Sequence, residues 1–441
     1  MGRIVLTTVG SFGDLHPKIA IAVELRKRGH DIVFATHKEY QAKLEGLGFA
    51  FHRMRPDCSA LSDPIEMARM MDLRKGQEYV IRHWILPSLR DTFDDLMTCA
   101  THADFIIAGE GVMAARLVAE TMRIPWACTV LQPLSFLSVY DPFVLPGIPF
   151  PGKLRRFGTT ANKLLIGLIK AVTKSWAAPV QQLRGELGLP PLKGNLFVDD
   201  KYSPHLVLAL FSEVLARPQP DWAPGTVVTG FPFYDGSDAG AELAPKLKNF
   251  LKSGPPPIVF TLGSSAVMTP GSFFEESILA VRQLKRRAVL LVGKNPSPQN
   301  LTDEIMALDY APYSHVFPHA CAIVHQGGIG TTAQALRAGR PTLVMPYSLD
   351  QPDNAARVDR LGTSRTIPRK EYAAVRVAKE LRELLERPDY AIKADKFGRI
   401  IQAEDAVGVA CDAIESRLSR DGVEQPDAPI AKRAHPQVGT Y

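Results

Sequence analysis

The 441-residue sequence lacks the features typical of disulfide-stabilised, cysteine-metal or membrane-spanning proteins. Its five cysteines form no C-x-x-C pair and are odd in number, which argues against a disulfide framework and against a cysteine-ligated metal. No stretch reaches the roughly 18 apolar residues that a membrane span needs, and the first residues predict a strand rather than a signal peptide. We therefore expect a protein of the reducing cytoplasm.

Charge of one sign is not concentrated in any part of the chain. The formal net charge is +6, and the lysines and arginines are dispersed without forming a basic block. Nucleic acid is therefore not an expected partner. No acidic pair or D-x-D pattern stands where a metal site would need it, so we expect no metal.

Two strand-turn-helix-strand units are present, and the first lies at the N-terminus. Residues 3–9 predict a strand, 10–14 a tight turn and 16–28 a helix, before a second strand at 31–36. The length of the chain exceeds that of one ordinary core, so two domains are expected.

The second unit spans residues 321–346. An apolar strand at 321–324 runs into His325, and a glycine-rich turn leads to a helix that ends at Gly339 and to a strand at 342–346. One of two threonines is expected to cap this helix. The glycines and threonines of the turn are Gly327, Gly328, Gly330, Thr331 and Thr332.

The pattern of elements predicts an α/β protein with two Rossmann-like domains. We expect an N-terminal domain at 1–215, a proline-rich linker at 216–226 and a second domain at 227–402. A C-terminal helix at 403–420 is expected to pack back on the N-terminal domain. Residues 421–441 lack hydrophobic periodicity and are expected to be disordered.

The glycine turn predicts an anion site. Its backbone can approach a ligand closely, and the N–H groups at the start of the helix favour a phosphate. One interpretation is an NAD(P)-dependent oxidoreductase, because Gly328 begins a G-x-G-x-x-A pattern with Asp350 about 20 residues further on. His325 at the strand end and the pair Asp350 and Gln351 favour a nucleotide diphosphate that carries a sugar.

At these residues the sequence resembles the family 1 glycosyltransferases, which have the GT-B fold and use nucleotide sugars without a metal. The matching segments are GSFGDLHP at 10–17 and the longer block at 310–358, which resembles the donor-binding signature of the family. The segment TGFPFYDGS at 229–237 looks most like bacterial rhamnosyltransferases and related flavonoid-glycosylating enzymes. The resemblance implies two domains facing across a cleft, with a UDP- or dTDP-sugar as cosubstrate and no other cofactor.

The resemblance also implies roles for individual residues. Tyr310 occupies the position where the family stacks an aromatic ring on the donor base, and Ala311 can offer backbone hydrogen bonds to it. Asp350 and Gln351 match the pair that binds the sugar hydroxyls, and His325 matches a donor to the diphosphate. The remaining donor-binding positions are Gly13, Gly263, Ser264, Ser265, Gly327, Gly328, Gly330, Thr331 and Thr332.

Three residues are candidates for the base that deprotonates the acceptor. Asp14 follows the first glycine turn and ranks first, although a role as a helix cap is about equally compatible with its spacing. His16 ranks second because the helix starting at Pro17 can turn it away from the cleft. Glu110 ranks third, since the glycines around it equally suit a simple turn.

The predicted function is an inverting transfer of glucose or rhamnose to a hydroxyl of a small apolar acceptor. Residues 67–84 and 141–160 are expected to form the acceptor walls, and their Met, aromatic and Pro residues suit a flavonoid, polyketide or hydroxy-fatty-acid lipid. Residues 153–176 form a basic and apolar helical stretch. A structural helix is one interpretation of this stretch, and a peripheral contact with a lipid surface is the other.

Overall fold

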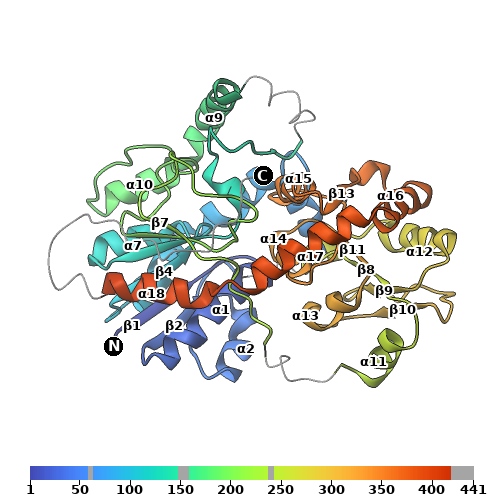
Figure 1. The fold of residues 1–441 in the computed structure, drawn as a ribbon. Coiled ribbons are helices and arrows are strands. Elements are labelled where there is room, and N and C mark those ends of the chain that lie inside the picture. The colour runs from blue at the N-terminus through green and yellow to red at the C-terminus, as the bar shows by residue number, and fades with distance from the viewer. Residues whose placement is uncertain (58–62, 148–157, 237–242, 419–441) are drawn as a thin grey trace.

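The protein is described by a computed structural model that covers residues 1–57, 63–147, 158–236 and 243–418. Two α/β domains lie next to each other, each built on one parallel sheet (Figure 1). Within the described residues, the first sheet has seven strands in the order β3-β2-β1-β4-β5-β6-β7, and the second has six in the order β10-β9-β8-β11-β12-β13. The structure confirms the predicted α/β fold with two Rossmann-like domains.

The strands of the first sheet are β1 (Arg3–Thr7), β2 (Asp31–Thr36), β3 (Ala50–Arg53), β4 (Phe105–Gly109), β5 (Trp126–Val130), β6 (Leu206–Ala209) and β7 (Thr226–Val228). The strands of the second sheet are β8 (Ile258–Thr261), β9 (Ala288–Leu291), β10 (Ile305–Leu308), β11 (Ala322–His325), β12 (Thr342–Val344) and β13 (Ser364–Thr366).

The helices of the first half of the chain are α1 (Phe12–Lys27), α2 (Gln41–Gly46), α4 (Pro64–Met70), α5 (Gly76–Tyr79), α6 (Leu89–Cys99), α7 (Ala114–Met122), α9 (Gly158–Thr173) and α10 (Ala178–Glu186). Those of the second half are α11 (Pro245–Lys252), α12 (Phe273–Leu284), α13 (Tyr313–Val316), α14 (Ile329–Arg337), α15 (Gln351–Arg360), α16 (Ala374–Glu386), α17 (Pro388–Gln402) and α18 (Ala406–Leu418).

The central strands are buried on both faces, which explains their apolar sequences. In β1, Ile4, Val5 and Leu6 are fully buried, and β8 is equally closed from solvent around Phe260. A parallel sheet with helices on both sides requires such continuous apolar runs. The carboxyl ends of the strands therefore carry the polar loops.

Helix α1 begins four residues earlier than the sequence suggested. Ser11 is its N-cap, and its hydroxyl accepts a hydrogen bond from the backbone N–H of Gly13 at 3.2 Å. In return, Asp14 Oδ2 accepts from the backbone N–H of Ser11 at 2.8 Å. This capping box moves the helix start to Phe12, so Pro17 lies inside the first turns rather than at the first position.

The crossing between the domains comes later than the expected linker at 216–226. Strand β7 pairs in parallel with β6, from Val207 opposite Thr226 to Ala209 opposite Val228. Residues 226–228 therefore belong to the first sheet, and the expected start of the second domain at 227 moves beyond this strand. Sequence alone did not reveal β7 because it is a three-residue edge strand without full burial.

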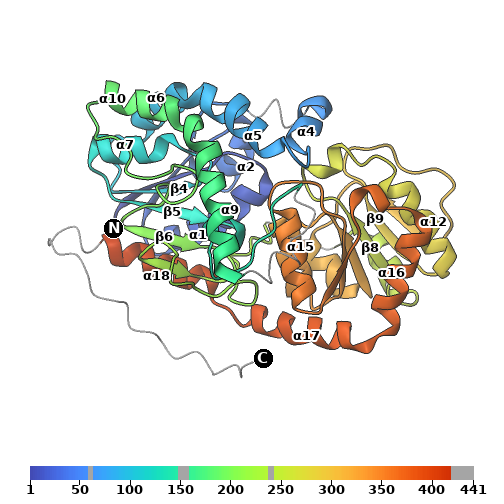
Figure 2. The same cartoon turned by 90° about the horizontal axis from the view of Figure 1, so that it is seen from above.

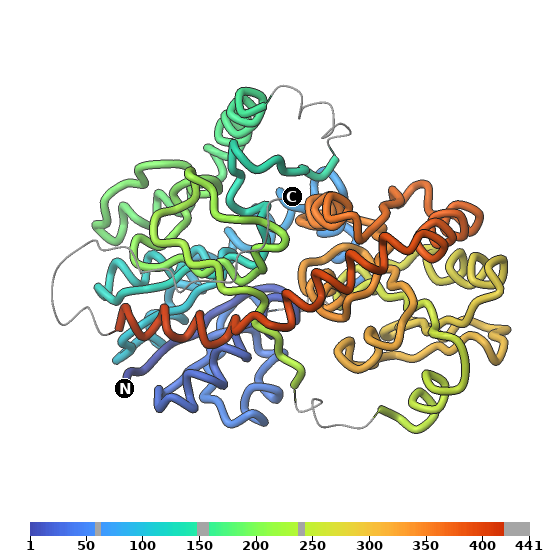
Figure 3. The backbone as a smooth tube through the Cα atoms, in the orientation of Figure 1, coloured from blue at the N-terminus to red at the C-terminus, as the bar shows by residue number. Residues whose placement is uncertain are grey.

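The chain returns to the first domain at its C-terminal end, as predicted. Helix α17 runs from the second domain toward the first, and α18 continues along the first domain (Figure 3). Cys411 and Ile414 of α18 are buried in the same core cluster as Leu25 of α1. Arg28 adds ion pairs to Asp412 and Glu415, both at 2.7 Å.

A buried arginine joins the two domains on another side. Arg357 of α15 is 2% exposed, and its Nε donates to Asp353 at 2.6 Å. Its Nη1 donates to Asp141 of the first domain at 2.5 Å and to the carbonyl of Leu215 at 3.2 Å. A buried charge is costly without partners, so this network stabilises one relative placement of the domains.

Other differences concern caps and short strands. The N-cap of α14 is Gly328, so Thr331 and Thr332 lie inside the first turn and neither caps the helix. Strands β3, β10 and β13 were also not expected from the sequence, since each has only three or four residues and lies toward the outside of its sheet. The expected tail at 421–441, and Lys153, Arg155 and Arg156, lie outside the described residues.

Seen from above, α9 extends along the first domain at the side nearer the second domain (Figure 2). In the part of the chain that the structure describes, no helix is both long and apolar enough to cross a membrane.

The packing of α18 predicts a measurable loss of stability. Ile414→Ala should lower the free energy of unfolding by about 2–4 kcal/mol, because a fully buried side chain would leave a cavity between α18 and the first sheet. Urea unfolding followed by circular dichroism measures the change. Ile392→Ala on α17 is the matched control, since Ile392 is 64% exposed and its truncation should change stability little. Equal effects of both substitutions would contradict the docking of α18.

Candidate active site

Two adjoining cavities lie between the domains at the carboxyl ends of both sheets. The first has a volume of about 720 Å³ and the second about 830 Å³. Both take side chains or backbone from each domain. The residues that line both cavities mark their junction: Ser11, Gly13, Leu131, Ser264, Ser265, Ile329, Gly330 and Thr331.

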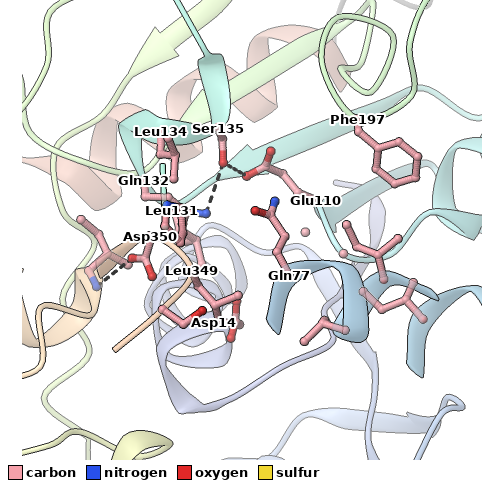
Figure 4. Close-up of a pocket in the computed structure, with 18 of the residues that line it drawn as sticks. Asp14, Gln77, Glu110, Leu131, Gln132, Leu134, Ser135, Phe197, Leu349 and Asp350 are labelled. Atoms are coloured by element: carbon pink, nitrogen blue, oxygen red, sulfur yellow. Dashed lines mark hydrogen bonds between the residues drawn. The ribbon is translucent and has the colours of Figure 1, made fainter. Parts of the chain in front are cut away.

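The domains approach each other closely through two glycines at this junction. A Cβ on Gly330 would lie 4.0 Å from the Cα of Gly13. Asp14 and Asp350 come from opposite domains and line the same first cavity (Figure 4). The two halves of the predicted site are therefore already together in this structure.

The second cavity is suited to a flat ring at its outer end. Tyr310 lines it and is 69% exposed, at the carboxyl end of the second sheet. Val267, Leu291 and Gly293 add apolar and backbone surface. Ala311 is 3% exposed and is not among the described residues that line this cavity, although its neighbours Tyr310 and Pro312 are.

The glycine turn and the loop after β8 meet at the junction of the cavities. Gly263 has a φ of +67°, and a Cβ there would lie 2.2 Å from Nε2 of Gln326. A Cβ on Gly328 would lie 2.9 Å from the same nitrogen. The side chain of Gln326 is 6% exposed, lines the first cavity and is 3.5 Å from Thr331 Oγ1. These glycines therefore make room for one amide between two loops.

Gly327 has a different role from its neighbours. It is buried with a φ of +89°, and a Cβ would lie 2.8 Å from Val344 and 3.1 Å from the carbonyl of Gln351. It lines neither of these cavities, so it shapes the turn without facing a ligand. Thr332 is 1% exposed and likewise lies behind the cavity wall.

His325 lies beneath the turn rather than at its surface. It is fully buried, and its Nδ1 accepts a hydrogen bond from the backbone N–H of Gly327 at 3.0 Å. That bond places the remaining proton on Nε2, for which no partner exists among the described residues. Burial lowers the pKa of His325 to about 3, so the ring is neutral at pH 7. The predicted donation from His325 to a diphosphate would therefore come from the Nε2–H of a neutral ring.

Asp350 lines the first cavity at the start of α15. Its Oδ2 accepts from the backbone N–H of Ile329 at 3.2 Å and from the amide of Asn354 at 2.6 Å. Burial raises its pKa to about 7. Gln351 is 5% exposed and also lines this cavity, but its Oε1 already accepts from the backbone N–H of Tyr347 at 2.8 Å. Its amide nitrogen and the second lone pair of Oε1 remain to meet a ligand.

Asp14 occupies the wall of the first cavity that comes from the first domain. Its Oδ2 completes the capping box from the N3 position, so Ser11 and not Asp14 is the N-cap of α1. Gly10 has a φ of +119°, and a Cβ there would lie 2.4 Å from Oδ2. Burial raises the pKa of Asp14 above its ordinary value, while Lys18 opposes that rise. A carboxylate with a raised pKa is a stronger base than an exposed one.

His16 lies on the other side of α1. It lines the second cavity but not the first, with its ring 5.3 Å from that of Tyr234. Burial, with a contribution from the charge of Lys43, lowers its pKa to about 4. His16 therefore faces the second cavity, whereas Asp14 lines the first.

Glu110 lines the first cavity, but both of its oxygens are already engaged. Oε1 accepts from Lys201 Nζ at 2.8 Å, and Oε2 accepts from the hydroxyl of Ser135 at 2.7 Å. Figure 4 shows Glu110 and Ser135 together on the wall away from Asp350. To accept a proton from an acceptor, Glu110 would therefore have to give up one of these two contacts.

The remaining wall of the first cavity is mainly aliphatic. Part of it comes from residues 71–81, inside the expected wall at 67–84, and part from Leu145 and Pro146, inside the expected wall at 141–160. Helix α9 contributes a second aliphatic set, which sequence reasoning treated as a separate feature. That set is Leu165, Leu168, Ile169 and Val172.

Two further positions that line the cavities were not identified from the sequence. Gln326 stands between His325 and Gly327 in the glycine-rich block, and this position was the signal that could have identified it. Lys18 is fully buried next to Asp14, and its place four residues after Asp14 in a helix was the corresponding signal. No group of three or more His, Cys, Asp and Glu side chains in the described ranges could hold a metal ion.

Two family models match the chain in order. The glycosyltransferase family 28 N-terminal domain matches residues 4–140, and the C-terminal domain of the erythromycin biosynthesis protein CIII-like family matches residues 281–406. The chain is 31% identical to the O-mycaminosyltylonolide 6-deoxyallosyltransferase of Streptomyces fradiae, over 94% of this chain and 97% of that protein. It is 28% identical to a sterol 3-beta-glucosyltransferase of Neurospora crassa, over 93% of this chain but only 27% of that longer protein.

A solved structure shares the same arrangement of two domains. The spinosyn rhamnosyltransferase SpnG complexed with thymidine diphosphate matches with a TM-score of 0.65 and 16% identity, over 94% of this chain and all of that one. The relatives exclude the alternative of an NAD(P)-dependent oxidoreductase. The chain belongs to the family 1 glycosyltransferases with the GT-B fold and is a glycosyltransferase.

Proposed function

We propose that the protein transfers a hexose or deoxyhexose from a UDP- or dTDP-sugar to a hydroxyl of an apolar polyketide or sterol-like acceptor, with inversion at the anomeric carbon. The observation that carries this proposal is the junction of two cavities, where the N-terminus of α14 and the partly buried carboxylate of Asp14 line the same space. The named relatives act on a tylonolide and on a sterol, which supports an apolar acceptor.

The second cavity is the proposed site of the nucleotide. Tyr310 stacks on the base, and the backbone N–H groups at the start of α14 with Ser264 and Ser265 bind the diphosphate at the junction. Gln326, whose Oε1 has no partner among the described residues, donates its Nε2–H groups toward the same phosphates. The thymidine diphosphate in the SpnG complex supports a dTDP-linked donor, and we expect UDP as the alternative.

The sugar is proposed to lie between Asp350 and Gln351 on one side and Asp14 on the other. Asp350 must ionise to accept hydrogen bonds from two hydroxyls, and a pKa of about 7 allows this near neutral pH. A donor diphosphate arriving at Ile329 N–H would compete with Asp350 Oδ2 for that group. We expect donor binding to release the Asp350 carboxylate toward the sugar.

The acceptor occupies the aliphatic first cavity, with its hydroxyl near Asp14. Asp14 accepts the hydroxyl proton as the oxygen attacks the anomeric carbon, and the bond to the diphosphate breaks on the opposite face. The start of α14 and Gln326 stabilise the charge that develops on the leaving diphosphate. This direct displacement inverts the anomeric configuration. His325 holds the glycine turn in the conformation that presents these N–H groups.

The first experiment separates the donor classes. Isothermal titration against dTDP, UDP and NAD should show binding of a pyrimidine diphosphate and no binding of NAD. A panel of dTDP- and UDP-linked glucose and rhamnose, tested against flavonoid, polyketide, sterol and hydroxy-fatty-acid acceptors, identifies the product by mass. Transfer to none of these apolar acceptors would contradict the proposal.

Asp14→Asn should lower kcat/KM by about 10²- to 10⁴-fold, because the amide cannot accept the acceptor proton. The affinity for the nucleotide diphosphate should change little, since Asp14 does not line the second cavity. In the unmodified enzyme, activity should fall as the pH drops through the raised pKa of Asp14, where the carboxyl becomes protonated. Steady-state kinetics across pH and titration of dTDP measure these effects.

Two controls test the choice of base. Glu110→Gln and His16→Asn should retain an acid limb in the pH profile, since neither residue is the proposed base. If Asp14→Asn kept the activity of the unmodified enzyme while Glu110→Gln lost it, the role of base would pass to Glu110.

Gly263→Ala should lower the affinity for the nucleotide diphosphate by at least about tenfold, because the new Cβ would displace Gln326 from the junction. Gly271→Ala is the matched control. Gly271 also has a positive φ, of +57°, but its Cβ would meet only Arg369 Nη2 at 4.0 Å. Both substitutions strain the backbone, so equal affinities for the two variants in calorimetry would argue against a role for Gln326.

A further inference from the structure

Helix α9 carries an aliphatic face that nothing in the described residues covers. Leu164, Leu168 and Val172 are 73%, 60% and 55% exposed. They stand four residues apart, so they form one stripe along the helix. Single exposed leucines are ordinary on protein surfaces, whereas an ordered stripe on one helix marks an interaction surface.

The charges of α9 complement a negative surface. Its sequence, GTTANKLLIGLIKAVT, contains two lysines and no acidic residue, and Lys174 follows directly. Lys163 and Lys174 are exposed and stand together on a strip that lies roughly 140° around the helix from the middle of the aliphatic stripe. Lys170 stands on that strip too, paired with Asp199 at 2.6 Å. Lysines on the polar side of a helix with an apolar face are typical of helices that lie in the headgroup region of a membrane.

The stripe is continuous with the first cavity. Leu168 and Val172 are exposed and also line that cavity, while Leu165 and Ile169 line it from farther inside. In Figure 1, α9 stands at the outer edge of the first domain, away from the core of both sheets. An apolar molecule leaving a bilayer at α9 would therefore meet the cavity wall without crossing water.

We propose that α9 is a reversible docking surface for an anionic lipid bilayer, through which the apolar acceptor enters the first cavity. This inference rests on the proposed function, in which the acceptor is apolar. It adds that the acceptor comes from the lipid bilayer. Leu164, Leu168 and Val172 insert into the interface, and Lys163 and Lys174 lie at the level of anionic headgroups. With three aliphatic side chains and few charges, binding is weak and sensitive to salt.

Cosedimentation of the full chain with vesicles tests the proposal without any donor or acceptor. The protein should bind vesicles that contain phosphatidylglycerol, and bind poorly to phosphatidylcholine alone or at high salt. Leu164→Glu should reduce the bound fraction by about tenfold, because it places a charge in the stripe. Leu164 does not line the first cavity, so transfer to a water-soluble acceptor should persist in this variant.

Leu279→Glu on α12 is the matched control, since Leu279 is 47% exposed on the second domain and should not affect vesicle binding. Lys163→Glu with Lys174→Glu provides a second variant that should bind weakly. Vesicle binding that Leu164→Glu leaves unchanged overturns the proposal. So does a dimer that the same substitution dissociates when the unmodified protein binds no vesicles, because the stripe is then a subunit interface. Failure of transfer to every acceptor with intact vesicle binding would instead overturn the proposed function.

Lys18 provides a separate observation beside Asp14. It stands one turn after Asp14 on α1 and is fully buried. A lysine is seldom fully buried unless a charged group lies near it. Its Nζ donates to the backbone carbonyl of Asp14 at 3.3 Å. A Cβ on Gly109 would lie 3.2 Å from this nitrogen. The ammonium therefore fills the space between α1 and the end of β4.

The titratable groups around Lys18 come from several elements. Asp14 faces it from α1, Glu110 from the end of β4 and Cys128 from β5, and Lys18, Asp14 and Glu110 line a third cavity of about 240 Å³. Glu110 is also paired with Lys201. Burial lowers the pKa of Lys18 to about 8, so the ammonium remains charged at neutral pH.

The geometry points to Lys18 as a positioning residue that keeps the Asp14 carboxylate ionised for proton abstraction. Across the cleft, the charge of Asp14 contributes to the raised pKa of Asp350, after the larger effect of burial. Lys201 is already committed to Glu110, so Lys18 is the cation whose effect reaches Asp14 most directly. This inference rests on the proposed role of Asp14 as the base.

The pH profile of kcat/KM distinguishes this role from a structural one. Lys18→Met should move the acid limb to higher pH by about one unit, because Asp14 loses its neighbouring positive charge. Lys18→Arg retains the charge and should keep the limb near its original position. A uniform loss of activity at every pH, with an unmoved acid limb, overturns the inference. Full activity of Asp14→Asn would instead remove the proposed function of Asp14 itself.

Discussion

The structure depends on one constraint, which is that the carboxyl ends of two parallel sheets face each other across a narrow junction. Parallel strands bury their sides between helices, so polar loops collect at their ends. The close approach of Gly13 and Gly330 holds two such ends together. The alignment of the sheets is maintained by α18, which packs on the first domain, and by buried Arg357, which contacts Asp141. Without this alignment neither cavity would be complete.

The site combines charge and apolar surface in adjoining spaces. On the donor side, the start of α14 and the Gln326 amide present hydrogen-bond donors where a diphosphate would lie. On the proposed acceptor side, aliphatic side chains of α9 line the same cavity as the Asp14 carboxylate. Exclusion of water raises the pKa of Asp14, and Lys18 limits that rise. In the proposed mechanism, the balance of these two effects sets how readily Asp14 accepts the acceptor proton.

Much of the architecture could be predicted because long buried strands have unmistakable sequences. The strand at 31–36, the glycine that ends α14 and the return of the C-terminal helix all agree with the structure. Short edge strands such as β7 were not recognisable, since they are paired by the neighbouring strand and carry no apolar run of their own. The early start of α1 depends on a capping box whose spacing was interpreted as a turn.

The sequence by itself determined the fold class, the family and the residues around the glycine turn, because these depend on local periodicity and on contiguous motifs. Only the tertiary structure decided which side chain of a motif faces the ligand. It buried His325 beneath the turn and placed Gln326 at the cavity, turned His16 toward the second cavity and Asp14 toward the first, and tied Glu110 to Lys201. The physical reason is that burial, pairing and cavity walls arise from contacts between segments far apart in the chain.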